Sequence, residues 1–341
     1  MTTTVSESPR TESTAAEAPP AGTDLPAPAG TADDADRAAG RDASTAAGLR
    51  RFLDYRRTTM ILAVLLVLVP AIALFPGTSR DALTDGLNDG FTITRLAAFV
   101  VIALVAAAVK GLSGFGYALI ATPLAAVLID PSVAVVVLGV PALVMNLFQV
   151  GETGTGREYL RRHWSLVLAA LVGSAIGVFI LTRFPATRIL GVVIGVVLVS
   201  YVLWAVARRG KPTTRTAHPA ALGTVGVAEG VLLGAVNMGP LLPAYLHTFE
   251  RDARRYIGGM SLVFTLVFAE RIGQMSATGL MTPQLLWLGS VIGLVTLVGL
   301  GAGTALRRWG RVNQKVFSAV VLTLLAATGV TMLAKTLPHL L

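Results

Sequence analysis

The sequence predicts an all-α polytopic membrane protein with two inverted repeats, each a broken, re-entrant helical hairpin plus three transmembrane helices, preceded by one extra N-terminal helix. The first observation behind this fold class is composition: 54% of the 341 residues are hydrophobic and only 14% are charged, whereas a water-soluble domain has roughly a quarter of its residues charged. The second is a series of apolar runs long enough to cross a bilayer. The third is that two of these runs are overlong, broken by glycine and proline, and similar to each other.

The residue counts exclude several kinds of site. The chain has no cysteine, which excludes disulfides, thiolate metal sites and cysteine nucleophiles. Its four histidines are scattered along the sequence. We therefore expect no metal and no cofactor. The net charge of +9 comes with arginines beside apolar runs, where they set membrane orientation, so we expect no nucleic-acid partner.

The N-terminal part divides into a tail and a first helix. Residues 1–49 are rich in Ala, Thr, Ser and Pro, with more acidic than basic residues, and we expect a disordered, acidic, cytoplasmic tail. Residues 50–92 are predicted to hold the N-terminal transmembrane helix and an external loop. Four arginines between residues 50 and 57 precede the uncharged run 58–75, which places the N-terminus in the cytoplasm. A cleaved twin-arginine signal is the alternative, but no small-residue cleavage pattern follows.

Eight more apolar runs follow. They cover residues 96–129, 132–150, 164–181, 189–207, 220–249, 256–275, 285–306 and 316–333. The runs 96–129 and 220–249 are anomalous, because about 30 residues are too many for one crossing at about 1.5 Å per residue and too few for two full ones.

The two anomalous runs align with each other. The matched pairs are Gly114 with Gly234, Pro123 with Pro243, Asp130 with Glu250, and Gly139 with Gly259. After a shift in register, residues 171–173 match residues 297–299. We therefore predict a duplication, with repeat 1 over residues 93–210 and repeat 2 over residues 211–341.

The positive-inside rule tests how often each repeat crosses the membrane. If the run 96–129 crossed once, the arginine-rich loops around residues 157–162 and 208–215 would lie outside. If it returns to the face that it entered from, both loops and the basic segment 307–315 lie inside, and only the two arginines between residues 183 and 188 break the rule. Each repeat then crosses an odd number of times, so the second is inverted. Inverted repeats with broken helices are typical of transporters, with the substrate site at the breaks.

The breaks, residues 110–117 and 230–240, supply most of the candidate site, because unwound amides beside a helix N-terminus can hold an anion. The predicted substrate-binding residues are Lys110, Gly111, Ser113, Gly114, Gly116, Asn146, Gly234, Asn237, Gly239 and Arg271. Glycine at intervals of three or four residues also lets helices approach closely. That is the role we predict for the pairs Gly173–Gly177 and Gly299–Gly303.

Lys110 and Arg271 supply the positive charge in this interpretation. A lysine near the centre of a membrane helix costs about 3 kcal/mol, so Lys110 needs a cavity or a counter-charge, for which Glu229 is a candidate. The alternative is that Lys110 reaches the interface from a short half-helix. Arg271 offers a planar fork suited to an oxyanion, and its alternative is a structural ion pair with Glu270.

With these segments the chain resembles the sulfite exporter TauE/SafE family of membrane permeases, over about residues 95–335. The resemblance rests on the glycine-rich segment 111–123, on the apolar helix through Asn146, and on the second copy from Gly234 to Pro243 leading to Arg271. It implies a permease of the cell (plasma) membrane for small anions such as sulfite and organosulfur or sulfonate-type compounds.

The chain departs from the usual family pattern at Phe115, Tyr117 and Asn237-Met238, so the resemblance does not identify the substrate. The expected mechanism is alternating access. The expected partners are a small anionic substrate, the lipid bilayer and a second copy of the chain in a homodimer.

Two other functions compete with transport. The segment from Gly111 to Gly114, followed by Tyr117, is similar to the nucleophile motif of rhomboid-like intramembrane serine proteases, with Ser113 as nucleophile. No histidine lies in the middle of a later apolar run, so we expect no enzyme. A non-transporting membrane scaffold would use the acidic tail to bind a partner, but the tail holds no defined recognition motif.

Overall fold

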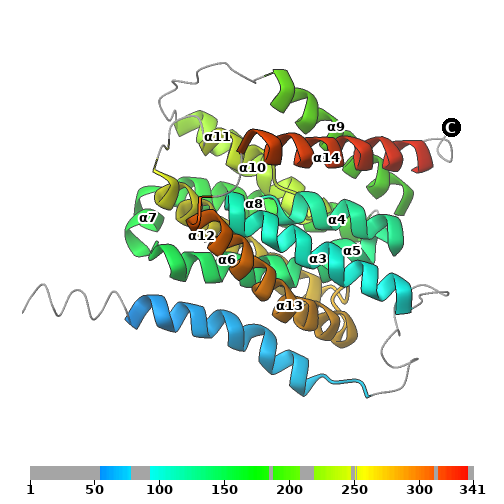
Figure 1. Cartoon of the computed structure of the whole chain (residues 1–341), viewed down its shortest axis with the longest axis horizontal. Helices are drawn as coiled ribbons and strands as arrows, with labels where there is room; N and C mark the ends of the chain where they lie inside the picture. The colour runs from blue at the N-terminus through cyan, green and yellow to red at the C-terminus, as the bar shows by residue number, and fades with distance from the viewer. Residues whose placement is uncertain are drawn as a thin grey trace, which may run out of the picture. The chain divides into compact units, whose positions relative to one another are not determined.

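The computed structural model describes residues 54–77, 93–183, 187–207, 219–246, 250, 252–310 and 314–336. Within these residues every regular element is a helix (Figure 1). The predicted tail, residues 1–49, and residues 78–92 of the predicted external loop lie outside the described residues and stay predictions.

The helices follow the apolar runs of the sequence. The first described helix is Asp54–Ala73. The described elements after it are α3 (Ile93–Ser113), α4 (Tyr117–Leu128), α5 (Pro131–Val137), α6 (Gly139–Thr153), α7 (Arg157–Arg162), α8 (Trp164–Arg183), α9 (Thr187–Ala207), α10 (Pro219–Val236), α11 (Leu241–Leu246), α12 (Ala253–Ala277), α13 (Pro283–Arg308) and α14 (Gln314–Thr336).

Six of the described helical segments are long and apolar enough to cross a membrane. They are Asp54–Ala73, Thr94–Ser113, Pro131–Thr153, Trp164–Arg183, Ala253–Ala277 and Pro283–Arg308. Shorter apolar helical stretches, among them Tyr117–Leu128 and Ala221–Val236, add to these. The predicted all-helical, multi-pass membrane protein is therefore confirmed.

Both overlong runs are interrupted helices. The run 96–129 forms α3 and α4, which meet at a first break over residues 114–116, and the run 220–249 contains α10 and α11, which meet at a second break over residues 237–240. Gly114 and Gly116 have φ angles of 87° and 97°, and Asn237 has a φ of 58°. Glycine adopts this left-handed region without penalty and asparagine tolerates it better than most residues, which explains why these residue types stand at the breaks.

Short polar side chains begin several of the other helices. Asp130 Oδ1 accepts hydrogen bonds from the Ser132 and Val133 amides at 2.7 and 3.3 Å, and Pro131 occupies the first turn of α5. Asp252 Oδ1 accepts from the Arg255 amide at 2.8 Å at the start of α12. These caps satisfy amides that have no partner inside the helix.

Two pairs of helices approach so closely that only glycine fits between them. A Cβ on Gly303 of α13 would lie 2.0 Å from the Ala108 carbonyl oxygen of α3, and one on Gly299 would lie 2.5 Å from Leu104 O. In the same way, a Cβ on Gly173 of α8 would lie 2.1 Å from a carbonyl oxygen of α10. The prediction that these glycines pack helices together is confirmed.

The remaining helices pack around these two pairs. α12 packs on α6, and α14 packs on α9. α6 also contacts α13, while α12 contacts α8. α6 and α12 therefore lie between the two glycine-packed pairs.

Basic side chains gather where α6 ends. Arg56 Nη2 donates to Glu152 O at 2.6 Å and Arg56 Nε donates to Gly151 O at 3.2 Å. The Glu152 carboxylate forms ion pairs with Arg307 at 3.4 Å and Arg308 at 3.1 Å. Cations at a helix C-terminus are stabilised by the helix dipole, so this cluster holds the N-terminal helix and α13 against α6.

The glycine packing generates a matched pair of variants on α13. Gly303→Ala should lower the free energy of unfolding by about 1–3 kcal/mol, the usual cost of overpacking, because the Ala108 carbonyl cannot move away without shifting its helix. Gly301→Ala is the control, because a Cβ there meets nothing within 4 Å and alanine favours a helix. Thermal unfolding of the purified protein in detergent measures both variants, and equal melting temperatures would contradict the packing argument.

Candidate functional site

A small cavity lies at the first break. Its volume is about 20 Å³, and its lining comes from both breaks, from α6 and from α12. Lys110, Asn146 and Tyr117 bring the polar side-chain groups of this lining, and Gly116 and Gly239 contribute backbone. A cavity of this size holds about one water molecule, so the site is closed in this conformation.

Lys110 is buried beside the first break. Its side chain comes from the last turn of α3 and is only 3% exposed. Its ammonium group donates to Asn146 Oδ1 at 2.9 Å and to Gly114 O at 3.4 Å. Asn146 is oriented by its own Nδ2, which donates to Ala142 O at 2.8 Å within α6. The amide oxygen of Asn146 is therefore held facing the ammonium group.

The hydrogen-bond partners of Lys110 are neutral oxygens. Glu229, the counter-charge suggested by the sequence, uses its Oε2 to accept a hydrogen bond from the Leu241 amide at 2.9 Å. The interfacial alternative for Lys110 does not fit a 3% exposed side chain. The site therefore holds a buried cation beside a cavity, without a carboxylate bonded to it.

Ser113 stabilises the end of α3. Its Oγ lies 2.8 Å from Val109 O and 2.7 Å from Phe115 O, so the hydroxyl group donates to carbonyls at the break. Phe115 N donates back to Ser113 Oγ at 3.4 Å. This bonding satisfies backbone groups that the broken helix leaves without helical partners.

Arg271 ties the second break to α5. Its side chain is fully buried. Nε donates to Gly234 O at 3.2 Å, Nη1 donates to Asn237 Oδ1 at 3.2 Å, and Nη2 donates to Val135 O at 3.0 Å. The planar guanidinium group thus joins three elements, since Gly234 ends α10, Asn237 belongs to the break and Val135 lies in α5. Glu270, its sequence neighbour, bonds instead to Gln274 one turn along α12.

Asn237 connects the second break to the first half of the chain. Its Nδ2 donates to Thr122 Oγ1 of α4 at 2.9 Å, and its Oδ1 accepts from Arg271. The sequence reasoning did not select Thr122. Its position directly before Pro123, within the duplicated segment, was the available signal.

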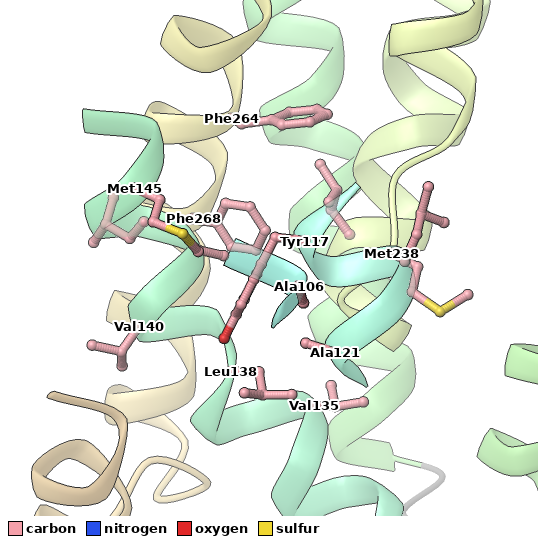
Figure 2. Close-up of a cluster of buried hydrophobic side chains, with 14 of the residues drawn as sticks. Ala106, Tyr117, Ala121, Val135, Leu138, Val140, Met145, Met238, Phe264 and Phe268 are labelled. Atoms are coloured by element: carbon pink, nitrogen blue, oxygen red, sulfur yellow. The ribbon is translucent and has the colours of Figure 1, made fainter. Parts of the chain in front are cut away.

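The wall of the site is hydrophobic and comes from both halves of the chain. Figure 2 shows the buried side chains that meet here: Ala106 of α3, Tyr117 and Ala121 of α4, Met145 of α6, Met238 of the second break, and Phe264 and Phe268 of α12. Tyr117, Phe264 and Phe268 also line the cavity. The Tyr117 hydroxyl group is buried and has no hydrogen-bond partner among the described residues. Apolar walls strengthen the electrostatic effect of the Lys110 charge, because little water screens it.

The structure brings the predicted residues together in two groups. Lys110, Gly116, Asn146 and Gly239 line the cavity, and Gly114 bonds to Lys110. Gly234, Asn237 and Arg271 form the hydrogen-bonded cluster at the second break.

Two predicted residues lie apart from these groups. A Cβ on Gly111 would lie 2.4 Å from Leu300 O, so Gly111 packs α3 on α13, while Ser113 bonds along its own helix. Contact of any of the ten residues with an anion stays a prediction.

Among the described residues, no cluster of three or more His, Asp or Glu side chains could hold a metal ion.

Comparison with known proteins gives one match. The family described as Sulfite exporter TauE/SafE matches residues 98–332, which include both breaks and every predicted site residue. No curated protein and no solved structure matches the chain.

The contacts of Arg271 generate a test of the second break. Arg271→Lys keeps the charge but cannot reach three acceptors in a planar fork, so it should lower the free energy of unfolding by about 1.5–3 kcal/mol, the contribution of a hydrogen bond to a charged group. Glu270→Gln is the neighbouring control, because glutamine can still accept from Gln274, and its effect should be much smaller. Thermal unfolding in detergent compares the two, and equal losses would show that Arg271 does not hold the break.

Proposed function

The chain belongs to the sulfite exporter TauE/SafE family, and on that premise we propose that it transports small anions, sulfite or organosulfur and sulfonate-type compounds, across the plasma membrane by alternating access. The family indicates a membrane transporter, and the apolar helices fit that function.

The buried ammonium group of Lys110 is the observation that carries this proposal. A charge inside a membrane protein is costly unless it is paired or marks a path for substrate. Lys110 has only neutral oxygens as hydrogen-bond partners and lines a cavity at a helix break. An anion bound in that cavity would balance the charge, and Asn146 and the backbone of Gly116 and Gly239 would surround it.

The closed cavity supports an alternating-access cycle. Its volume of about 20 Å³ suits one water molecule, whereas sulfite has four heavy atoms. The anion therefore enters only if the walls move. The breaks are where such movement costs least, because their backbone is not held by continuous helical hydrogen bonds, and Arg271 and Asn237 hold the second break through side-chain bonds that can re-form elsewhere.

Paired contacts support the two repeats. α3 of repeat 1 packs on α13 of repeat 2, and α10 of repeat 2 packs on α8 of repeat 1. Gly303 faces Ala108 O in the first pair, just as Gly177 faces Val231 O in the second. Each broken helix thus packs on a helix of the other repeat, which is the exchange that a pseudo-two-fold axis produces.

The same contacts favour a different register for the broken helices. Gly111 lies against Gly303, and Gly234 lies against Gly177, so Gly111 corresponds to Gly234. The sequence by itself pairs Gly114 with Gly234. The contact-based register pairs Gly114 instead with Asn237, and this fits the backbone, because both have positive φ.

The contacts between α6 and α12 show the same symmetry, because each contact has a counterpart in which the two repeats swap roles. Counted from the capping residues that precede α5 and α12, Gly139 corresponds to Ser261 and Gln149 corresponds to Arg271. A Cβ on Gly139 would lie 2.5 Å from Arg271 Nη1, while Ser261 Oγ lies 3.0 Å from Gln149 Oε1. The two contacts join matching positions with the repeats interchanged.

The basic cluster at the end of α6 supports the orientation. Arg254, at the start of α12, donates from Nε to Thr153 O at 2.9 Å, and Arg56, Arg307 and Arg308 contact the neighbouring residue Glu152. Basic residues from three segments, the N-terminal helix, the start of α12 and the end of α13, therefore meet at one end of the bundle. The positive-inside rule makes this the cytoplasmic end, with the N-terminus cytoplasmic as well.

The protease alternative has a weaker basis. The Ser113 hydroxyl group is engaged by the carbonyls of Val109 and Phe115, and the family indicates transport. The scaffold alternative depends on the acidic tail, which lies outside the described residues.

Uptake of labelled sulfite into proteoliposomes tests the proposal. Wild-type protein should show saturable flux. Lys110→Ala should raise the KM about tenfold or more, because a hydrogen bond to a charged group contributes about 1.5–3 kcal/mol and each 1.4 kcal/mol is a factor of ten. Thr331→Ala on the exposed face of α14 is the control, and Ser113→Ala should keep part of the flux, whereas a protease would lose all activity. Unchanged flux in Lys110→Ala would remove that residue from the site, and no flux of sulfite or sulfonates in wild type would contradict the proposal.

Cysteine labelling of the cysteine-free chain tests the inverted topology. Asp130→Cys should react with a membrane-impermeant reagent from outside the cell and Arg251→Cys only from inside, because the two residues follow equivalent hairpins of opposite orientation. Thr278→Cys, between α12 and α13, is the external reference. Labelling of positions 130 and 251 from the same side would contradict inversion.

A further inference from the structure

Glu229 is a buried carboxyl group that anion binding does not use. It lies in α10 and is fully buried. Its Oε2 accepts a hydrogen bond from the Leu241 amide at 2.9 Å, and the Leu242 amide also contacts the group. Its Oε1 has no hydrogen-bond partner among the described residues. The carboxyl group thus attaches the start of α11 to α10 and leaves one oxygen unpaired.

The unpaired oxygen lies against the wall of the Lys110 cavity. A Cβ on Gly239 would lie 2.5 Å from Glu229 Oε1, and Gly239 also lines the cavity together with Lys110. One residue of the second break therefore separates the two groups. An anion that displaces Gly239 on entering the cavity also displaces the atoms packed against the carboxyl group.

A larger cavity lies near the other side of Glu229. It has a volume of about 620 Å³ and lies between α9, α10 and α11. Its lining includes Ala228, next to Glu229 in sequence, and Leu241, whose amide binds the carboxylate and whose side chain is 38% exposed. Tyr201 of α9 lines this cavity and interacts electrostatically with Glu229. Leu241 thus links the larger cavity to the Glu229 carboxyl group.

Among the described residues around Glu229, no cation is hydrogen-bonded to its carboxyl group. Tyr256 of α12 interacts with it electrostatically, and its hydroxyl donates to Pro243 O at 3.2 Å. α11 contributes Tyr245 to the larger cavity. α8, packed closely on α10, carries its one charged residue, Arg183, at its far end. On α12 the nearby cation is Arg271, whose three nitrogens bind Gly234, Asn237 and Val135.

Lys110 and Glu229 lie in different repeats. In the contact-based register Lys110 of α3 corresponds to Leu233 of α10, and Glu229 corresponds to Ala106. Each broken helix therefore carries one ionisable residue near the site, a cation in repeat 1 and a carboxyl group in repeat 2. A site that binds both an anion and a proton needs both groups: a cation for the anion and a carboxyl group for the proton.

We propose that Glu229 binds and releases a proton during the transport cycle and so couples anion flux to the proton gradient. The step balances simply: the carboxylate takes up one proton from the solvent on the side where the anion enters and releases that proton to the solvent on the side where the anion leaves. Protonation removes the charge from the group that holds the Leu241 amide, and a neutral acceptor binds more weakly than a charged one, so α11 and the second break are freed to move. The coupling rests on the proposed anion transport.

The test compares Glu229→Gln with Glu270→Gln in proteoliposomes of the full-length chain. Glutamine at 229 keeps an oxygen for the Leu241 amide but cannot ionise. With one proton per anion, a gradient of one pH unit should sustain about tenfold accumulation of labelled sulfite by wild type. Glu229→Gln should still exchange sulfite at equal pH but lose this accumulation, while Glu270→Gln, a half-buried carboxyl group of α12, should keep it. Accumulation retained in Glu229→Gln would overturn the proposal.

A wild-type measurement keeps the test decisive if Glu229→Gln does not fold. A pH-sensitive dye inside the vesicles should report proton movement when sulfite is added. Anion flux without proton movement would overturn the coupling alone. No flux of any anion by wild type would overturn the proposed function, and the coupling with it.

Discussion

In a membrane, backbone groups released by a broken helix must find partners inside the protein, because lipid offers none. The two breaks of this chain meet that requirement in different ways. At the first, Ser113 and Lys110 bond to carbonyls of the break itself. At the second, Arg271 donates a hydrogen bond to a carbonyl at the end of α10, and Glu229 accepts one from the amide at the start of α11. The polar side chains of the site are therefore the ones that make the breaks possible.

This requirement separates the rigid part of the structure from the part that can change. The glycine-packed pairs α3–α13 and α8–α10 bring backbones into direct contact, and such contacts do not adjust gradually. The breaks are held by side-chain hydrogen bonds, which can exchange one acceptor for another. A conformational change is therefore expected to move α4 and α11 relative to the paired helices, and to open the closed cavity between them.

In the proposed duplication each broken helix carries one ionisable residue near its break, at positions that do not correspond, so one site holds both kinds of charge. Lys110 lies beside the cavity in one half and Glu229 lies behind Gly239 in the other. Gly239 contacts the Glu229 side and also lines the Lys110 cavity, and the hydrogen bonds of Lys110 go to Asn146 and Gly114 instead of the carboxylate.

The sequence by itself indicated that the chain lies in a membrane, where its helices are and where both breaks fall. It also indicated that Gly173 and Gly303 pack helices together, because hydropathy and small-residue spacing are local properties. The sequence motifs also indicated the family. Tertiary structure alone decided which partners the buried charges have. Lys110 meets Asn146 rather than Glu229, and Arg271 reaches Val135 on a distant helix. These pairings depend on how helices far apart in sequence are placed and rotated, and no local pattern contains that information.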